Sequence, residues 1–238
     1  MRSAIEVQRA ALVHELHKHR KPQGDFPLQS YLRSPYPVLG LCTPTIRKIK
    51  GDFAKAHHDL STTHLNALAK SLWKDKTFEE KILAIGLLNR FHRTLNRRTW
   101  RMMDSWIEQA QGWALCDSLG SGPISTMLHK DGSKFRDVFS WTRAENFWRR
   151  RISTYALRDL VYRKDLKRPS VVLERLLYDE EFWVQRAVGT WLRECWKRDR
   201  RKTQSFLLKH AKGMPRITIT VATERTSKSF REKLRRTR

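Results

Sequence analysis

The sequence has few cysteines, few acidic residues and no long apolar run, and each shortage excludes a class of protein. Cys42, Cys116 and Cys195 are too scattered for a disulfide framework or a CxxC zinc site, and they indicate a reducing compartment. No run of about eighteen apolar residues occurs, which excludes a membrane-spanning helix. The N-terminal segment shows no apolar stretch before a small-residue cleavage site, so we expect a cytoplasmic protein.

The shortage of acidic residues leaves a large positive charge. Lysine and arginine number 49 against 24 acidic residues, which gives +25 over 238 residues. Such a charge opposes compaction, and the usual reason to keep it is a polyanionic partner, with nucleic acid first and an anionic membrane surface second. A solubilising charge spread over all faces is the alternative. An apolar content of 39% with nine tryptophans is enough for a packed core.

Helical periodicity dominates the chain. Apolar residues recur at near-helical spacing over residues 3–19, 135–163, 169–178, 181–198 and 203–211. Thr77 followed by Glu80 predicts a capping box, and Thr43 followed by Pro44 predicts a helix that opens on Thr43 as its capping residue. The run ITITV at 217–221 fits either a helix or an extended segment.

An aromatic residue recurs every 35 residues, at Phe78, Trp113, Trp148 and Trp183. The segments FWRRRI at 147–152 and FWVQRA at 182–187 are also alike. A period filled by two helices and two turns is typical of HEAT or TPR repeats, and we expect Trp148 and Trp183 to pack between repeats. We therefore predict an all-α, HEAT-like helical repeat solenoid with a basic concave face. It would be one domain over residues 1–228, followed by a basic tail over residues 229–238. Coincidence within a helical bundle is the alternative.

Trp113 and Asp117 are the first candidates for chemistry. On a helix they would share one face, because they are four residues apart. An electron-rich ring beside a carboxylate suits a developing cation, such as the oxocarbenium-like sugar formed when an N-glycosidic bond breaks. The alternative, which residue types alone favour, is that Asp117 caps the following helix and Trp113 is a core residue.

Four segments follow one another in an order that is more specific than any one of them. The first is Tyr31-Leu32-Arg33 with Leu39-Gly40, Thr43-Pro44 and Arg47; the others are the WxxxD pair at 113–117, FWRRR at 147–151 and FWVQRAVGTWLRE at 182–194. Together they resemble the AlkD-type DNA alkylation repair glycosylases, a family built from HEAT-like repeats, over nearly the whole chain.

The resemblance implies hydrolysis of the N-glycosidic bond of cationic N3- and N7-alkylated purines in duplex DNA, with no metal and no organic cofactor. It implies that Asp117 stabilises the sugar cation and positions water, that Trp113 packs against the sugar, and that Arg151 holds the adjacent phosphate. Further DNA contacts are expected from Tyr31, Thr43, Arg149, Arg150, Arg186, Trp191 and Arg193.

We expect a monofunctional enzyme, because no lysine lies in the WxxxD segment to form a Schiff base. A nucleoid-associated monomer that acts on double-stranded DNA containing alkylated bases, without a membrane partner, follows from the same resemblance.

Thr190 departs from the family pattern. Active members carry a tryptophan after the glycine of the C-terminal segment, whereas here Trp191 comes one residue later. One helical step turns a side chain by about 100°, so Trp191 points elsewhere unless a local shift restores it. Cys42 also replaces a polar residue of the family. These departures leave open a non-catalytic HEAT-like module that binds damaged or branched DNA. A helical repeat that scaffolds RNA or protein is a third reading.

Overall fold

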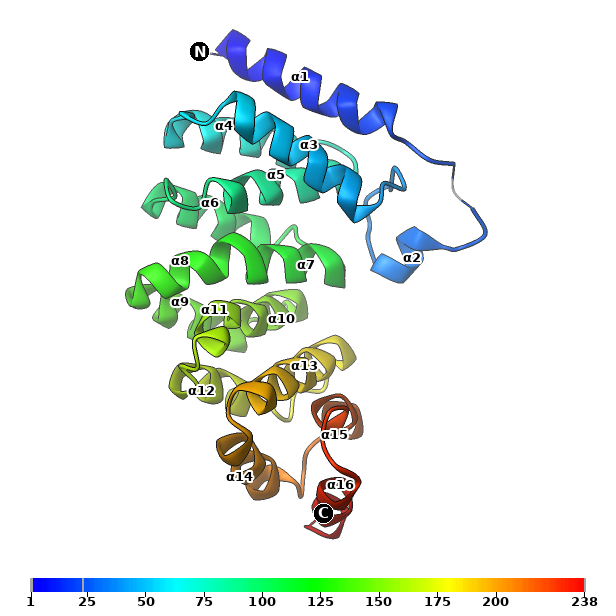
Figure 1. The fold of residues 1–238 in the computed structure, drawn as a ribbon, viewed down its shortest axis with the longest axis vertical. Coiled ribbons are helices and arrows are strands. Elements are labelled where there is room, and N and C mark those ends of the chain that lie inside the picture. The colour runs from blue at the N-terminus through cyan, green and yellow to red at the C-terminus, as the bar shows by residue number, and fades with distance from the viewer. Residues whose placement is uncertain (1, 23, 238) are drawn as a thin grey trace. The chain divides into compact units, whose positions relative to one another are not determined.

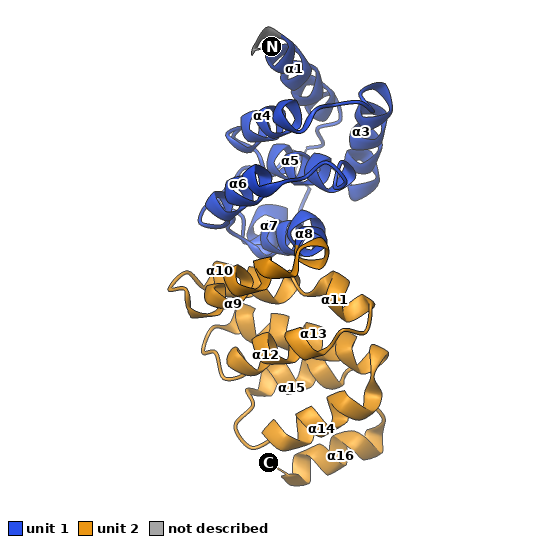
Figure 2. Cartoon of the chain, turned by 90° about the vertical axis from the view of Figure 1, so that its left-hand side faces the viewer, with its two compact units in different colours: residues 1–127 blue, residues 128–238 orange. Residues whose placement is uncertain are grey.

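The computed structural model describes residues 2–22 and 24–237, and every regular element within these ranges is a helix or helical turn. The predicted all-α class is therefore confirmed. The chain divides into two compact units, residues 1–127 and residues 128–238, where the sequence predicted one domain (Figure 2). Among the described residues, no helix has the length and apolar character needed to cross a bilayer.

The first unit is built from helices that pack against their neighbours along the chain (Figure 1). Helix α1 contacts α3 and α4, and α5 contacts α3, α4 and α7. A π-helical turn, Gly120–Ile124, follows α7 directly. The helices are α1 (Arg2–Lys18), α2 (Leu28–Leu32), α3 (Thr43–Ala56), α4 (Thr62–Trp73), α5 (Phe78–Arg90), α6 (Arg97–Ile107) and α7 (Trp113–Leu119), with α8 (Ser125–Lys130) at the boundary.

Local sequence signals explain where several of these helices begin. The predicted capping box is confirmed at α5, where Thr77 Oγ1 accepts the Glu80 amide and the Glu80 carboxylate accepts the Thr77 amide. The predicted start of α3 is wrong by one residue, because Cys42 occupies the N-cap position and Thr43 is already helical. The first turn of a helix tolerates proline, so Pro44 is compatible with a helix capped by Cys42 or by Thr43.

Helix α13 (Phe182–Arg198) is central to the second unit. It contacts α10, α11, α12, α14 and α15, and α16 contacts α14. At Gly189 the approach to α15 is so close that an added Cβ would lie 2.8 Å from the Thr218 carbonyl oxygen. The other helices are α9 (Phe135–Ser140), α10 (Phe147–Tyr155), α11 (Arg158–Tyr162), α12 (Lys167–Arg175), α14 (Arg200–His210), α15 (Arg216–Thr223) and α16 (Lys228–Thr237).

The 35-residue aromatic series marks equivalent places in the helices. Phe78 and Trp113 are the first residues of α5 and α7, while Trp148 and Trp183 are the second residues of α10 and α13. The rings of Trp148 and Trp183 lie 6.1 Å apart between α10 and α13, so the predicted packing of this pair is confirmed. The basic concave face stays a prediction.

The C-terminal residues differ from the expected basic tail. Residues 228–237 form α16, and its Phe230 and Leu234 are buried. The Phe230 ring lies 4.9 Å from that of Trp196 on α13. These apolar residues are four apart, so they fall on one helix face that packs on the second unit. The ambiguous run at 217–221 lies within helix α15.

Candidate functional site

Helix α7 carries the predicted pair Trp113 and Asp117 one turn apart, both partly exposed. Gly112 precedes the helix with φ of +86° and ψ of +145°, a conformation that glycine adopts without strain. A Cβ on Gly112 would lie 2.5 Å from the Leu32 carbonyl oxygen and 2.7 Å from that of Arg33. The start of α7 therefore sits against the end of α2, at a distance that only glycine permits.

This close approach builds an aromatic cluster beside α7. The Trp113 Nε1–H donates to the Tyr31 carbonyl oxygen at 2.7 Å, and the Tyr31 ring meets the indole edge-on at a centroid distance of 5.4 Å. Phe26 adds a third ring, 5.3 Å from Tyr31. Tyr31 and Phe26 are 55% and 60% exposed, respectively. Phe26 was not predicted from the sequence as part of the site. Its aromatic side chain, five residues before Tyr31, is the only feature of the sequence that could have indicated it.

Asp117 does not occupy the N-cap position considered for it. It lies inside α7, whose N-cap is Gly112, and its main-chain oxygen accepts the Ser121 hydroxyl at 2.5 Å. The π-helical turn that follows α7 has Leu119 as its N-cap. Trp113 and Asp117 thus share a helix face, as the four-residue spacing predicts.

The segment that leads to Thr43 is held by a buried carboxylate. Glu79 on α5 is 1% exposed and accepts the amides of Leu39, Gly40 and Leu41 at 2.9, 2.9 and 3.2 Å. Thr43 itself is exposed at the start of α3. From sequence, Glu79 looks like an ordinary acidic residue of the first helical turn, so its structural role was not foreseen.

The surroundings of the neighbouring Cys42 lower the pKa of its thiol. Its Sγ lies 3.1 Å from the Thr45 hydroxyl, and hydrogen bonding with Thr45 lowers the pKa of the exposed Cys42 thiol. Burial has the opposite effect on Cys195, where it raises the thiol pKa to about 12.

Lys50 is another group that the sequence did not single out. Its aliphatic chain lies across Gly86 of α5, where an added Cβ would come within 2.9 Å of the lysine Cδ. Burial lowers the pKa of Lys50, and the positive charges of Arg47 and Arg90 lower it further. Lys50 and Arg47 on α3 and Arg90 at the end of α5 are therefore near enough for the two arginines to repel a charge on Lys50.

In the second unit, Arg151 is buried on α10 rather than presented to solvent. The residue is only 4% exposed. The guanidinium donates to the Trp183 carbonyl oxygen at 2.5 Å and to the Tyr155 hydroxyl at 3.1 Å. It also lies 5.0 Å from the Tyr155 ring centroid. These contacts link α10 to the first turn of α13.

The two preceding arginines also have partners within the second unit. Arg150 forms a bidentate pair with Asp179, at 2.7 and 3.1 Å, and donates to the carbonyl oxygens of Ala144 and Glu145. Four donor contacts of its guanidinium are thus satisfied inside the protein. Arg149 is partly buried, with its guanidinium carbon 5.4 Å from the Trp141 ring.

The three residues of α13 that were predicted to contact DNA differ from one another in burial and in their partners. Trp191 is 4% exposed, with its ring edge-on to Tyr155 at 5.5 Å, so it is a core residue here. Its buried Nε1 has no hydrogen-bond partner among the described residues. Arg193 is paired with Glu224. Arg186 is exposed and lies 5.7 Å from the Phe182 ring.

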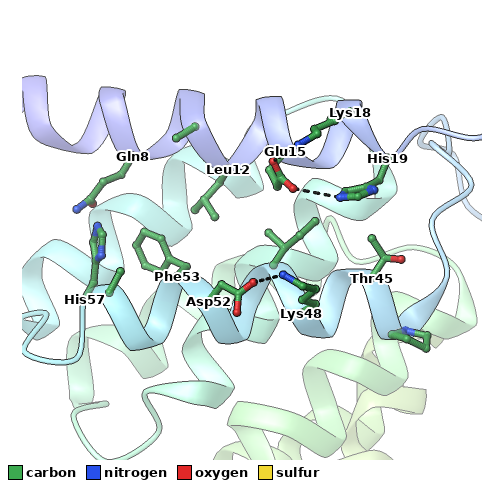
Figure 3. A pocket seen from close by; sticks show the side chains of 14 residues that line it. Gln8, Leu12, Glu15, Lys18, His19, Thr45, Lys48, Asp52, Phe53 and His57 are labelled. Carbon is green, nitrogen blue, oxygen red and sulfur yellow. Dashed lines mark hydrogen bonds and ion pairs between the residues drawn. The ribbon is translucent and has the colours of Figure 1, made fainter.

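A groove of about 780 Å³ lies elsewhere in the first unit, between α1 and α3 (Figure 3). Its walls are mainly apolar and include Leu12 and Phe53. Two polar pairs border it: His19 with Glu15 at 3.1 Å, and Lys48 with Asp52 at 2.6 Å. Among the described residues that line it, none belongs to the predicted site.

The chain was compared with protein families, curated proteins and solved structures. The family model described as DNA alkylation repair enzyme matches residues 12–226. No curated protein matches the chain.

Solved structures support the fold. A predicted DNA alkylation repair enzyme from Enterococcus faecalis is similar with a TM-score of 0.74 at 16% identity, over 88% of this chain and 99% of that one. AlkD2 from Streptococcus mutans gives 0.67 at 13% identity, over 93% and 98%. The protein smu.31 of Streptococcus mutans gives 0.59 at 14% identity, over 77% and 98%.

Proposed function

Because the chain belongs to the DNA alkylation repair enzyme family, we propose that it is a DNA glycosylase that excises cationic N3- and N7-alkylated purines from duplex DNA. The observation that carries the proposal is the placement of Trp113 and Asp117, two partly exposed residues, one turn apart on α7. The net charge of +25 supports a polyanionic substrate.

The proposed reaction does not require a general acid to protonate the departing base. Alkylation gives the purine a positive charge, so it leaves with the bonding electron pair as a neutral molecule. The positive charge then develops on the sugar, where the Asp117 carboxylate would stabilise it electrostatically. A water oxygen bonds to the sugar carbon that lost the base, and its proton passes to Asp117 or to solvent. The products are a free base and an abasic site.

The aromatic residues would shape the surface around that carboxylate. Trp113 is held by its hydrogen bond to the Tyr31 carbonyl, so its ring has a defined orientation beside Asp117. The exposed ring of Tyr31 extends this surface. Aromatic faces favour a nearby cation, which supports placing the sugar against Trp113.

The arginines proposed as phosphate contacts in the second unit differ in how exposed they are. Arg186 is exposed, which suits direct contact with a phosphate. The burial of Arg151, and its bonds to Trp183 and Tyr155, favour a positioning role instead. Arg150 likewise orders the loop around Asp179. Thr43 is exposed at the start of α3 and stays a proposed contact in the first unit.

The test is release of methylated purine from duplex DNA treated with a methylating agent. Asp117→Asn should reduce the single-turnover rate by about 10²-fold, because it removes the charge at the reaction centre. Its affinity for undamaged duplex should stay at the wild-type level or rise slightly. The matched control is Asp52→Asn, which removes an exposed carboxylate from α3. Equal rates for the wild type and Asp117→Asn would refute the role of Asp117.

A non-catalytic module that binds damaged or branched DNA is the second candidate, and Thr190 is the observation that favours it. A competition between intact duplex and a four-way junction distinguishes the two functions. A binder should prefer the junction and release no base, whereas a glycosylase should release base from alkylated duplex. Wild-type protein that binds DNA without release would replace the first proposal with the second.

A further inference from the structure

A cavity of about 400 Å³ lies in the second unit, among α13, α14 and α16. Its apolar side is formed by Trp196 and Phe230, whose rings are 4.9 Å apart. Three cationic side chains line the rest, one from α14, one from the loop before α16 and one from α16 itself. They are Arg200, Arg225 and Lys233.

The charge of this cavity is not balanced within its walls. Among the described lining residues there is no carboxylate, and the remaining polar groups are Gln204 and two serine hydroxyls. Three of the acidic residues near the lining are engaged with other cations: Glu224 pairs with Arg193, Glu194 with Lys197 and Asp199 with Lys202. Glu232, beside Lys233 on α16, is exposed and does not line the cavity. Three like charges around one cavity repel one another, so binding an anion there would relieve the repulsion.

The other groups in the cavity suit an oxyanion as well. The hydroxyls of Ser227 and Ser229 are hydrogen-bonded to each other at 3.0 Å, which leaves one of the two O–H groups to donate to a ligand. Ser227 Oγ accepts the Phe230 amide, which marks the positively polarised start of the ten-residue helix α16. Arg200 has its guanidinium carbon 5.8 Å from the Trp196 ring. Arginine with hydroxyl donors and a helix start is a usual combination for phosphate.

From this geometry we propose that the cavity formed by Arg200, Arg225 and Lys233 binds a phosphate group. Its volume falls within the range of small-molecule sites and exceeds the size of a bare anion. The phosphate therefore belongs to a larger ligand, either a strand of nucleic acid or a free phosphorylated molecule such as a nucleotide. The site lies outside the residues assigned to base excision.

The first arm of the test uses the full chain and inorganic phosphate. Phosphate should raise the melting temperature of the wild type relative to chloride at the same ionic strength. The double variant Arg225→Gln/Lys233→Gln should lose most of this rise. The control Arg201→Gln/Arg236→Gln removes two exposed charges from α14 and α16 outside the cavity lining, and it should keep the rise.

The second arm identifies the source of the phosphate. Affinity for undamaged duplex is measured by anisotropy over a series of salt concentrations. If a DNA strand supplies the phosphate, the slope of log affinity against log salt should fall by about 0.9 for each DNA phosphate that the variant no longer neutralises. That fall should exceed the one seen in the control. If the slope equals that of the control while phosphate protection is abolished, a free phosphorylated molecule is the ligand.

Folding defects are separated from loss of binding by two measures. Arg200, Arg225 and Lys233 are all exposed, so their variants should melt like the wild type in chloride. Ser229→Asp places a carboxylate in the cavity and should also abolish the phosphate-dependent rise. If the double variant and Ser229→Asp retain both the rise and the salt slope, the site does not exist. Neither arm measures base release, so failure of the proposed glycosylase activity leaves this result standing.

Discussion

Replacing Gly112 with alanine should destabilise the first unit and disturb the proposed site together. The backbone at Gly112 has φ of +86° and ψ of +145°, a region that costs a residue with a side chain about 1–3 kcal/mol. The new Cβ would also meet the Leu32 carbonyl oxygen at 2.5 Å. Such overpacking costs about 1–3 kcal/mol, because backbone atoms rather than a flexible side chain must move.

The combined loss is about 4 kcal/mol, taking about 2 kcal/mol from the middle of each range. For a chain of this length, each kcal/mol lowers the melting temperature by about 2–4 °C, so a fall of about 8–16 °C is expected in a circular dichroism melt. The end of α2 should also move away from α7, which would break the bond from Trp113 to the Tyr31 carbonyl. Base release at a temperature where the variant is folded should fall as a result.

Gly51→Ala is the matched control. Gly51 lies inside α3, and an added Cβ there would meet nothing within 4 Å. Alanine is the better helix former by about 1 kcal/mol, so this variant should melt at or above the wild-type temperature. If Gly112→Ala melts like Gly51→Ala, the end of α2 does not sit against α7 as described, and the positioning of Trp113 needs another explanation.

Two further predictions concern titrating groups. Cys42 should be alkylated by iodoacetamide near pH 8 well before Cys195, because Thr45 lowers the pKa of the first thiol and burial raises that of the second to about 12. Mass spectrometry should find Cys195 labelled only after unfolding, and Thr45→Ala should slow labelling of Cys42; equal rates at both thiols would contradict the structure. Lys50→Met should stabilise the protein by about 0.5–1 kcal/mol, because it removes a half-buried cation that faces Arg47 and Arg90. The folded state of the wild type binds fewer protons than the unfolded state between the lowered pKa and 10.5, so its stability should rise with pH through that window. The variant should lack that rise, and a lower melting temperature for Lys50→Met would show that packing of the lysine stem over Gly86 dominates.

Signals that act within one or two helical turns could be predicted from sequence. The capping box at Thr77 and the shared face of Trp113 and Asp117 need only local spacing. The 35-residue series also located the first turns of four helices, because each repeat reuses one packing position. The boundary at α3 was off by one residue, because threonine is a preferred capping residue, whereas the N-cap is Cys42, whose side chain makes no capping hydrogen bond.

Contacts between distant segments could not be predicted in the same way. Arg150 read as a basic surface residue, but its partner Asp179 is 29 residues away and satisfies it internally. Glu79 read as a helix-start acid, whereas its burial depends on three amides about 40 residues earlier. The last ten residues were predicted to be a charged tail, because their own sequence does not show what Phe230 packs against. Its partner is the ring of Trp196, which lies on another helix.

The surroundings of Gly189 decide what the departure at Thr190 means for the site. A one-residue shift that brought Trp191 into the position of Thr190 would rotate α13 by about 100°. Gly189 would then leave its close approach to Thr218, and a side chain would have to enter a gap where a Cβ already lies 2.8 Å from a carbonyl oxygen. The shift would also withdraw the Trp191 ring from its buried contact with Tyr155. Trp191 therefore stays in the core, and we expect the aromatic surface of the proposed reaction to come from the first unit, where Trp113 on α7 meets Tyr31 on α2.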